Sequence, residues 1–139
     1  MDGALQLMGR AGFVLFTLGL LLGAALPKMR NPRMGLSAHL TAVQTGPALI
    51  AFAMFWQYLS VPKSWTPLLT SALVLSSFVL VIGITLAGFT GASEALPIAG
   101  KGYQATRSKE RLVSLLVRGS SIVMVLSCLA ICYFTFNNG

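Results

Sequence analysis

The sequence predicts an all-α fold, an integral membrane four-helix bundle, on three observations. Hydrophobic residues form 55% of the 139 residues, charged residues form only 9%, and the mean hydropathy is +0.79. Soluble domains carry roughly 25% charged residues, so this composition excludes a soluble globular protein, and it is too apolar for a disordered chain. The charges also leave four long gaps, over 11–27, 34–62, 64–93 and 119–139. With its apolar flanks, each gap supplies the ~20 residues that cross a bilayer core of about 30 Å.

We expect these gaps to form helices in one transmembrane domain, 1–139. Closed β-barrels also span membranes, but their strands alternate polar and apolar residues. Runs such as 20–22 and 78–82 are apolar at every position, which favours helices. The four helices are predicted at about 5–26, 37–59, 66–89 and 112–136.

The first two helices carry small residues at a spacing that allows close packing. Gly19 and Gly23 stand four residues apart in the first helix, and Ala42 and Gly46 do so in the second. In lipid, where burial supplies little driving force, such pairs let two backbones approach each other. We expect Pro47 to kink the second helix, because proline cannot donate a backbone hydrogen bond.

The last two helices carry a further pair of small residues and two cysteines. The third carries another small pair, Gly83 and Ala87, within an almost wholly apolar segment. The fourth carries Cys128 and Cys132 one turn apart. We expect buried thiols that pack as small apolar side chains, because two cysteines at this spacing on one helix form a disulfide of poor geometry.

The charges indicate a membrane topology and no nucleic-acid partner. The net charge is +7, but the cations lie in the short links between the hydrophobic runs. Two cations, Arg10 near the N-terminus and Lys63 in the second link, lie on the side of the membrane that holds the termini. Cytoplasmic links carry the excess of Lys and Arg, so we expect the first and third links in the cytoplasm and both termini outside, in the inner membrane if the source is a bacterium. Seven cations support this orientation: Lys28, Arg30, Arg33, Lys101, Arg107, Lys109 and Arg111.

Few ionisable residues remain for chemistry inside the membrane. The three acidic residues, Asp2, Glu94 and Glu110, all lie outside the predicted spans. This distribution excludes a carrier coupled to protons through a membrane carboxylate, and it excludes catalysis by paired carboxylates. His39 and Arg118 lie within the spans, where ionisable residues are candidates for function.

Each of these two residues has two interpretations. His39, the one histidine in the chain, is either an interfacial side chain bonded to a carbonyl or water, or the axial ligand of a haem iron. One histidine suffices for haem, whereas a zinc site needs several ligands. Arg118 either extends to the lipid headgroups or faces the bundle and pairs with an anion, for instance a haem propionate.

Three segments resemble a known enzyme family. Segment 31–40 reads NPRMGLSAHL, segment 10–16 reads RAGFVLF and segment 96–102 reads LPIAGKG. The first resembles the signature of the hydroxylaminobenzene mutase family, and the other two resemble its first helix and third link. The resemblance covers most of the chain. The family is itself similar to the membrane-bound styrene oxide isomerases.

The resemblance implies a reaction, a cofactor and an assembly. Family members convert hydroxylaminoarenes to aminophenols, and the isomerases convert epoxides to aldehydes. It further implies a homotrimer, a small aromatic substrate and a haem b whose iron is bound by His39. Thr45 stands where the family has an asparagine before a glycine, so Thr45 is expected to orient the substrate. The arginines expected to bind the haem propionates are Arg30, Arg33 and Arg118.

Three hypotheses follow. The first is a membrane isomerase or mutase that depends on haem b. The second is a haem-binding accessory or redox protein of the same fold, because segment 78–85 is mostly apolar here and its counterpart in the enzymes is polar. The third is a structural membrane subunit without a cofactor.

Overall fold

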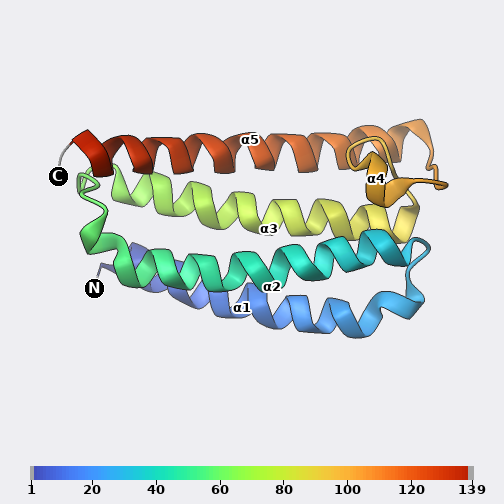
Figure 1. Ribbon diagram of the computed structural model, residues 1–139, viewed down its shortest axis with the longest axis horizontal. Helices are drawn as coiled ribbons and strands as arrows, with labels where there is room; N and C mark the ends of the chain where they lie inside the picture. The colour runs from blue at the N-terminus through green and yellow to red at the C-terminus, as the bar shows by residue number, and fades with distance from the viewer. Residues whose placement is uncertain (1, 138–139) are drawn as a thin grey trace.

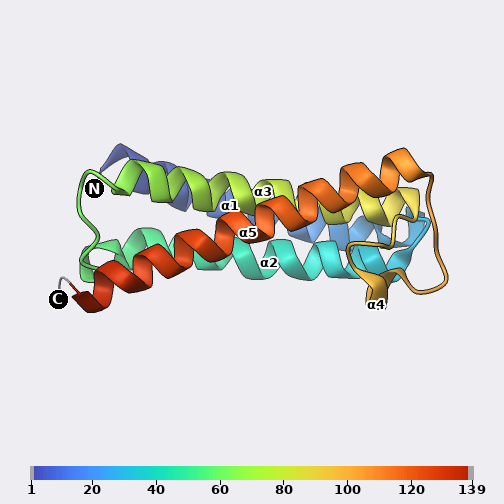
Figure 2. The same cartoon turned by 90° about the horizontal axis from the view of Figure 1, so that it is seen from above.

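The computed structural model describes residues 2–137 and confirms an all-α bundle (Figure 1). Four long helices run antiparallel to their neighbours in sequence, and α5 crosses the bundle diagonally when seen from above (Figure 2). All four are long and apolar enough to cross a membrane, so the chain is a multi-pass integral membrane protein. The helices are α1 (Gly3–Ala25), α2 (Pro32–Phe55), α3 (Thr66–Thr90), α4 (Pro97–Gly100) and α5 (Arg107–Asn137), with 3-10 turns at Leu26–Lys28 and Trp56–Tyr58.

Two predicted helix starts were wrong. The second helix begins at Pro32 rather than near 37, because the side chain of Asn31 accepts the Met34 N–H and proline suits the first helical position. The fourth helix begins at Arg107 rather than near 112, so its first turn is polar. Glu110, expected in a link, is therefore helical.

The predicted glycines bring α1 and α2 into backbone contact. A Cβ atom on Gly46 would lie 2.7 Å from the Gly12 carbonyl oxygen, and one on Gly19 would lie 2.9 Å from the Val43 nitrogen. Real side chains do not fit at such distances, so these glycines are required for the helix pair. α2 remains helical through Pro47.

The cysteine prediction was wrong for Cys132. Cys128 is half-buried and packs against the apolar core, but Cys132 is exposed. It lies beside a hollow of about 180 Å³ between α2 and α5. Both thiols are free.

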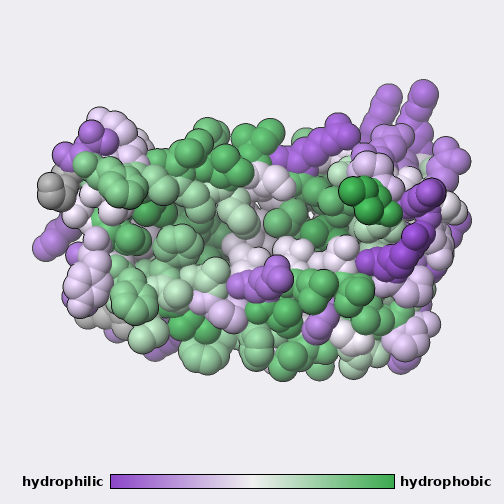
Figure 3. All heavy atoms as spheres, viewed as in Figure 1, coloured by the Kyte–Doolittle hydropathy of each residue, from purple (hydrophilic) through white to green (hydrophobic). Residues whose placement is uncertain are grey.

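The two ends of the bundle differ in character. Both termini lie at one end, and the α1–α2 link and α4 lie at the other (Figure 1). Hydrophilic side chains gather most densely at the α4 end, and hydrophobic side chains cover much of the middle (Figure 3). Near the termini, the rings of Trp65 and Phe134 lie 5.6 Å apart, and the Trp56 indole N–H donates to the Thr66 hydroxyl. The aromatic residues thus line one end of the spans.

Candidate functional site

His39 lies two turns into α2, with its ring against α1. The side chain is half-buried, and its Nδ1 lies 2.7 Å from the Gly19 carbonyl oxygen. A carbonyl oxygen only accepts, so Nδ1 carries the proton in this hydrogen bond. Among residues 2–137, no hydrogen bond to Nε2 is found. In the neutral ring, Nε2 therefore presents a free lone pair.

Gly23 gives the imidazole its place beside α1. A Cβ atom on Gly23 would lie 2.8 Å from Nδ1 and 3.0 Å from Cε1 of His39. The ring thus occupies the space that any other residue at position 23 would fill. The sequence singled out Gly19 and Gly23 for helix packing but did not connect them with His39, because that connection depends on the register between α1 and α2.

His39 is a single donor rather than part of a ligand cluster. Within the described part of the chain, no group of three His, Cys, Asp or Glu side chains could hold a metal ion. A bare zinc site of the usual kind is therefore not formed by these residues, since zinc takes three or four protein ligands. A haem iron needs one axial ligand from the protein, which fits His39.

The three candidate arginines meet around one segment, 90–101. Arg30 donates to the Thr90 carbonyl at 2.7 Å, Arg33 donates to the Lys101 carbonyl, and Arg118 approaches the Glu94 carbonyl at 3.4 Å. All three side chains are exposed. Each guanidinium has five N–H donors, so donors remain for an anion. The chain does not bring these arginines into contact with His39.

Thr45 lies on a different face of α2 from His39. Its hydroxyl donates to the Thr41 carbonyl of its own helix at 2.5 Å. Six residues correspond to a displacement of about 9 Å along the helix and about 240° around it. Within one chain, the structure therefore does not bring Thr45 and His39 together.

Sequence reasoning missed a second polar residue in this part of α2. Gln44 is exposed, and its side chain makes no hydrogen bond with any residue from 2 to 137. The signal was available, because an amide within a charge-free run is itself unusual in a membrane span. Gln44 is thus a further candidate for contact with a polar substrate group.

Glu110 and Asn31, also missed, organise the link after α3. The Glu110 carboxylate is buried and accepts the backbone N–H groups of Ser93, Glu94 and Ala105 at 3.0–3.1 Å. The Asn31 amide donates to the Ala99 carbonyl at 2.9 Å. Glu110 could have been recognised from the sequence as an acidic residue in the first turn of a helix. Its hydrogen-bond partners could not be predicted. These contacts fold segment 91–106 over the α4 end of the bundle.

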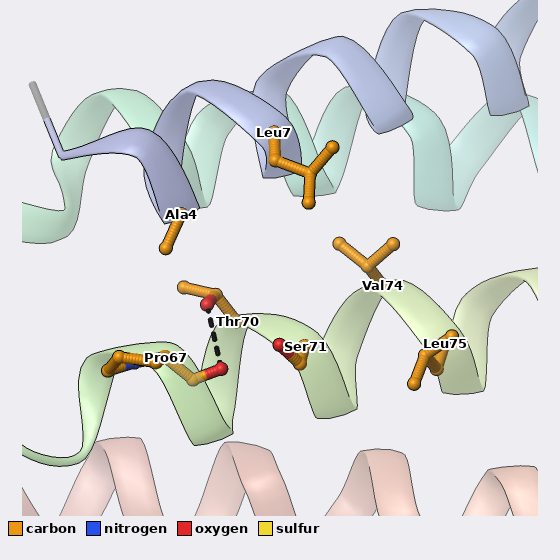
Figure 4. A pocket seen from close by; sticks show the side chains of 7 residues that line it. All are labelled: Ala4, Leu7, Pro67, Thr70, Ser71, Val74 and Leu75. Carbon is orange, nitrogen blue, oxygen red and sulfur yellow. Dashed lines mark hydrogen bonds between the residues drawn. The ribbon is translucent and has the colours of Figure 1, made fainter.

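One hollow of the bundle is remote from His39. It has a volume of about 230 Å³ and lies between the first turns of α1 and α3 (Figure 4). Leu7 and Val74 point toward each other across it, and the Thr70 hydroxyl bonds to the Pro67 carbonyl at its wall. His39 contacts the last turns of α1 instead, so this hollow is not its binding site.

Comparison with known proteins identifies a family. The family model described as styrene oxide isomerase matches residues 5–136. Hydroxylaminobenzene mutase HabA of Ectopseudomonas oleovorans is 38% identical over 108 residues, which are 77% of this chain and 80% of HabA. Hydroxylaminobenzene mutase HabB of the same organism is 36% identical over 118 residues, or 84% of this chain and 72% of HabB. The resemblance expected from the sequence is confirmed: the chain belongs to the styrene oxide isomerase family.

Proposed function

We propose that this protein is a membrane isomerase of the mutase kind, which rearranges the bonds of a small aromatic substrate that carries an N–O or epoxide C–O bond. The reaction converts a hydroxylaminoarene to an aminophenol, or an epoxide to an aldehyde, so substrate and product have the same atoms and no electrons are exchanged with a partner. The observation that carries the proposal is the state of His39 in a chain of this family. Its Nδ1 is bound to the Gly19 carbonyl, and its Nε2 has no hydrogen-bond partner among residues 2–137.

The proposal includes haem b, whose iron His39 would bind. Metal-bound histidines typically donate their other ring N–H to a carbonyl or carboxylate, as His39 does toward Gly19. When bound, the haem iron supplies a Lewis acid for the substrate oxygen. His39 would hold and orient the group through its Nε2.

Arginines at the α4 end are the proposed partners of the haem propionates. Arg30, Arg33 and Arg118 present exposed guanidinium groups, and a guanidinium pairs well with a carboxylate. The proposal extends to a homo-oligomer, a trimer as the family resemblance implies. The half-exposed ring of His39 leaves one side accessible to a neighbouring copy.

The proposed orientation places the α4 end in the cytoplasm and both termini outside. The seven cations of the first and third links support it, since these links lie at the same end of the bundle (Figure 1). In this orientation, the arginines that would pair with the propionates lie toward the cytoplasm.

A haem spectrum is the first test. We expect a Soret band in detergent-purified protein and its loss in His39→Ala, with Gly119→Ala as a matched control because Gly119 faces open space. Absence of the band after haem supplementation would contradict the haem part of the proposal. Turnover of phenylhydroxylamine to 2-aminophenol, or of styrene oxide to phenylacetaldehyde, tests the reaction.

A haem-binding protein without isomerase activity is the second candidate. It is favoured by one observation, the hydroxyl of Thr45 engaged with the backbone of its own helix. A Soret band together with inactivity toward both substrates would select this function. A cofactor-free structural subunit is selected if neither band nor turnover is found.

A further inference from the structure

We propose that Gly19 and Gly23 of α1 are positioning residues for His39: the Gly19 carbonyl fixes which ring nitrogen carries the proton, and the missing side chain of Gly23 keeps the ring in place to make that bond. The proposal rests on the proposed function only for its haem readout. Its geometric part concerns α1 and α2 alone.

The hydrogen bond determines which nitrogen is available. The Gly19 oxygen lies 2.7 Å from Nδ1, a normal N–H···O distance. Because the proton resides on Nδ1, the lone pair resides on Nε2, which points away from the carbonyl across the ring. A hydrogen bond from the other ring nitrogen also fixes the orientation of a metal-binding histidine. Gly19 thereby affects how strongly His39 binds iron.

Gly23 differs from the other glycines between α1 and α2 in what it contacts. A Cβ atom on Gly12 or Gly46 would collide with backbone atoms of the opposite helix, at 2.6 Å and 2.7 Å. At Gly23, the three nearest atoms all belong to the His39 ring: Nδ1 at 2.8 Å, Cε1 at 3.0 Å and Cγ at 3.5 Å. Gly12 and Gly46 therefore serve helix packing, whereas Gly23 serves the imidazole.

A methyl group at position 23 is expected to displace the ring and leave the helices in place. A side chain can rotate away from a collision, but a backbone segment cannot do so without moving its helix. The displaced ring loses the alignment of Nδ1 with the Gly19 oxygen. Gly23→Ala should therefore change the properties of His39 without unfolding the bundle.

Gly9→Ala is the matched control. Gly9 lies on the same helix and faces the same neighbour, and its added Cβ would lie 3.6 Å from the Ala53 Cβ, an ordinary contact. Both variants replace a helical glycine of α1 by alanine, so effects of helix propensity are shared. Only Gly23→Ala reaches His39.

The haem readout is affinity and spectrum. We expect haem to bind Gly23→Ala about 10–100-fold more weakly than the parent protein, the range typical for loss of a hydrogen-bonded partner of a metal-binding histidine. The Soret band of the residual complex should shift, and Gly9→Ala should match the parent in both. Equal affinity and spectra in the two variants would overturn the proposal.

Two readouts do not depend on haem. Nitrogen NMR of ¹⁵N-histidine-labelled protein before haem addition should show a protonated Nδ1 and an unprotonated Nε2 in the parent protein, and a mixture of the two forms in Gly23→Ala. A double-mutant cycle of Gly23→Ala with His39→Ala should show coupling in thermal stability, because the glycine substitution meets no ring once His39 is removed.

These readouts distinguish a failure of the proposed function from a failure of the positioning role of Gly19 and Gly23. If no variant binds haem, the proposed function fails, and the NMR spectrum and the cycle still decide the positioning. A proton on Nε2 in the parent protein, or an absence of coupling in the cycle, overturns the positioning role even when haem binds.

Discussion

Both oxygens of the Glu110 carboxylate accept the backbone N–H of Ser93, at 3.1 Å and 3.0 Å. The same carboxylate binds the N–H groups of Glu94 and Ala105, although its side chain is only 3% exposed. The hydrogen-bond donors to this buried carboxylate are thus backbone N–H groups. These bonds connect both ends of segment 91–106 to the first turn of α5.

Removal of this carboxylate should destabilise the α4 end. Hydrogen bonds to a charged group contribute about 1.5–3 kcal/mol, and Glu110→Ala removes the acceptor of three backbone N–H groups. We expect a clear drop in the thermal midpoint in detergent and faster proteolysis within 91–106. Glu94→Ala, which removes an exposed acid, is the control. Equal midpoints for the two variants would show that the Glu110 bonds do not contribute.

Backbone contact between α1 and α2 predicts strong sensitivity at Gly12. A Cβ atom there lies 2.6 Å from the Gly46 oxygen, so Gly12→Ala must separate the helices. We expect loss of the monodisperse peak in size-exclusion chromatography of a fluorescent fusion. Gly119→Ala on α5, where a Cβ meets nothing within 4 Å, should keep that peak and gain about 0.5–1 kcal/mol of stability. A monodisperse Gly12→Ala variant would contradict the packing.

The polar residues of α2 can be ranked by kinetics. The Thr45 hydroxyl is bonded to the Thr41 carbonyl, so Thr45→Val should lower kcat/KM for phenylhydroxylamine by less than about tenfold. The Gln44 amide has no such partner within 2–137, so Gln44→Leu should have the larger effect. The reverse order would return the substrate-orienting role to Thr45, as the family resemblance implies.

Topology can be measured with reporters. A periplasmic reporter fused after Gly139 should be active, and one inserted after Gly102, whose surroundings are open, should be inactive. A cytoplasmic reporter at the same two positions should give the opposite pattern. Activity of the cytoplasmic reporter after Gly139 would reverse the orientation inferred from the Lys and Arg distribution.

The four helices could be predicted because lipid imposes a simple requirement on sequence. A span needs about 20 apolar residues, and the charge-free runs supply them. The starts of α2 and α5 could not be found in this way. Pro32 and Arg107 begin helices whose first turns project beyond the apolar run, and such turns depend on local capping, as at Asn31.

The candidate site was predictable in its residue types and not in its contacts. His39 could be selected because it is the one histidine of the chain and lies within a span. Its contact with Gly19 depends on the register between two helices, which charge and hydropathy do not specify. The same limit applies to Arg30 and Arg33, whose carbonyl partners lie about 60–70 residues further along the chain.

The position of His39 against α1 has a consequence for biosynthesis. The imidazole, the carbonyl that orients it and the glycine that makes room for it all lie within the first 39 residues. Contacts between residues close in sequence form early, and chains fold from the N-terminus as they leave the ribosome. Among residues 2–137, the contacts that orient the imidazole therefore lie within the first helical hairpin, α1 and α2, and involve neither α3 nor α5.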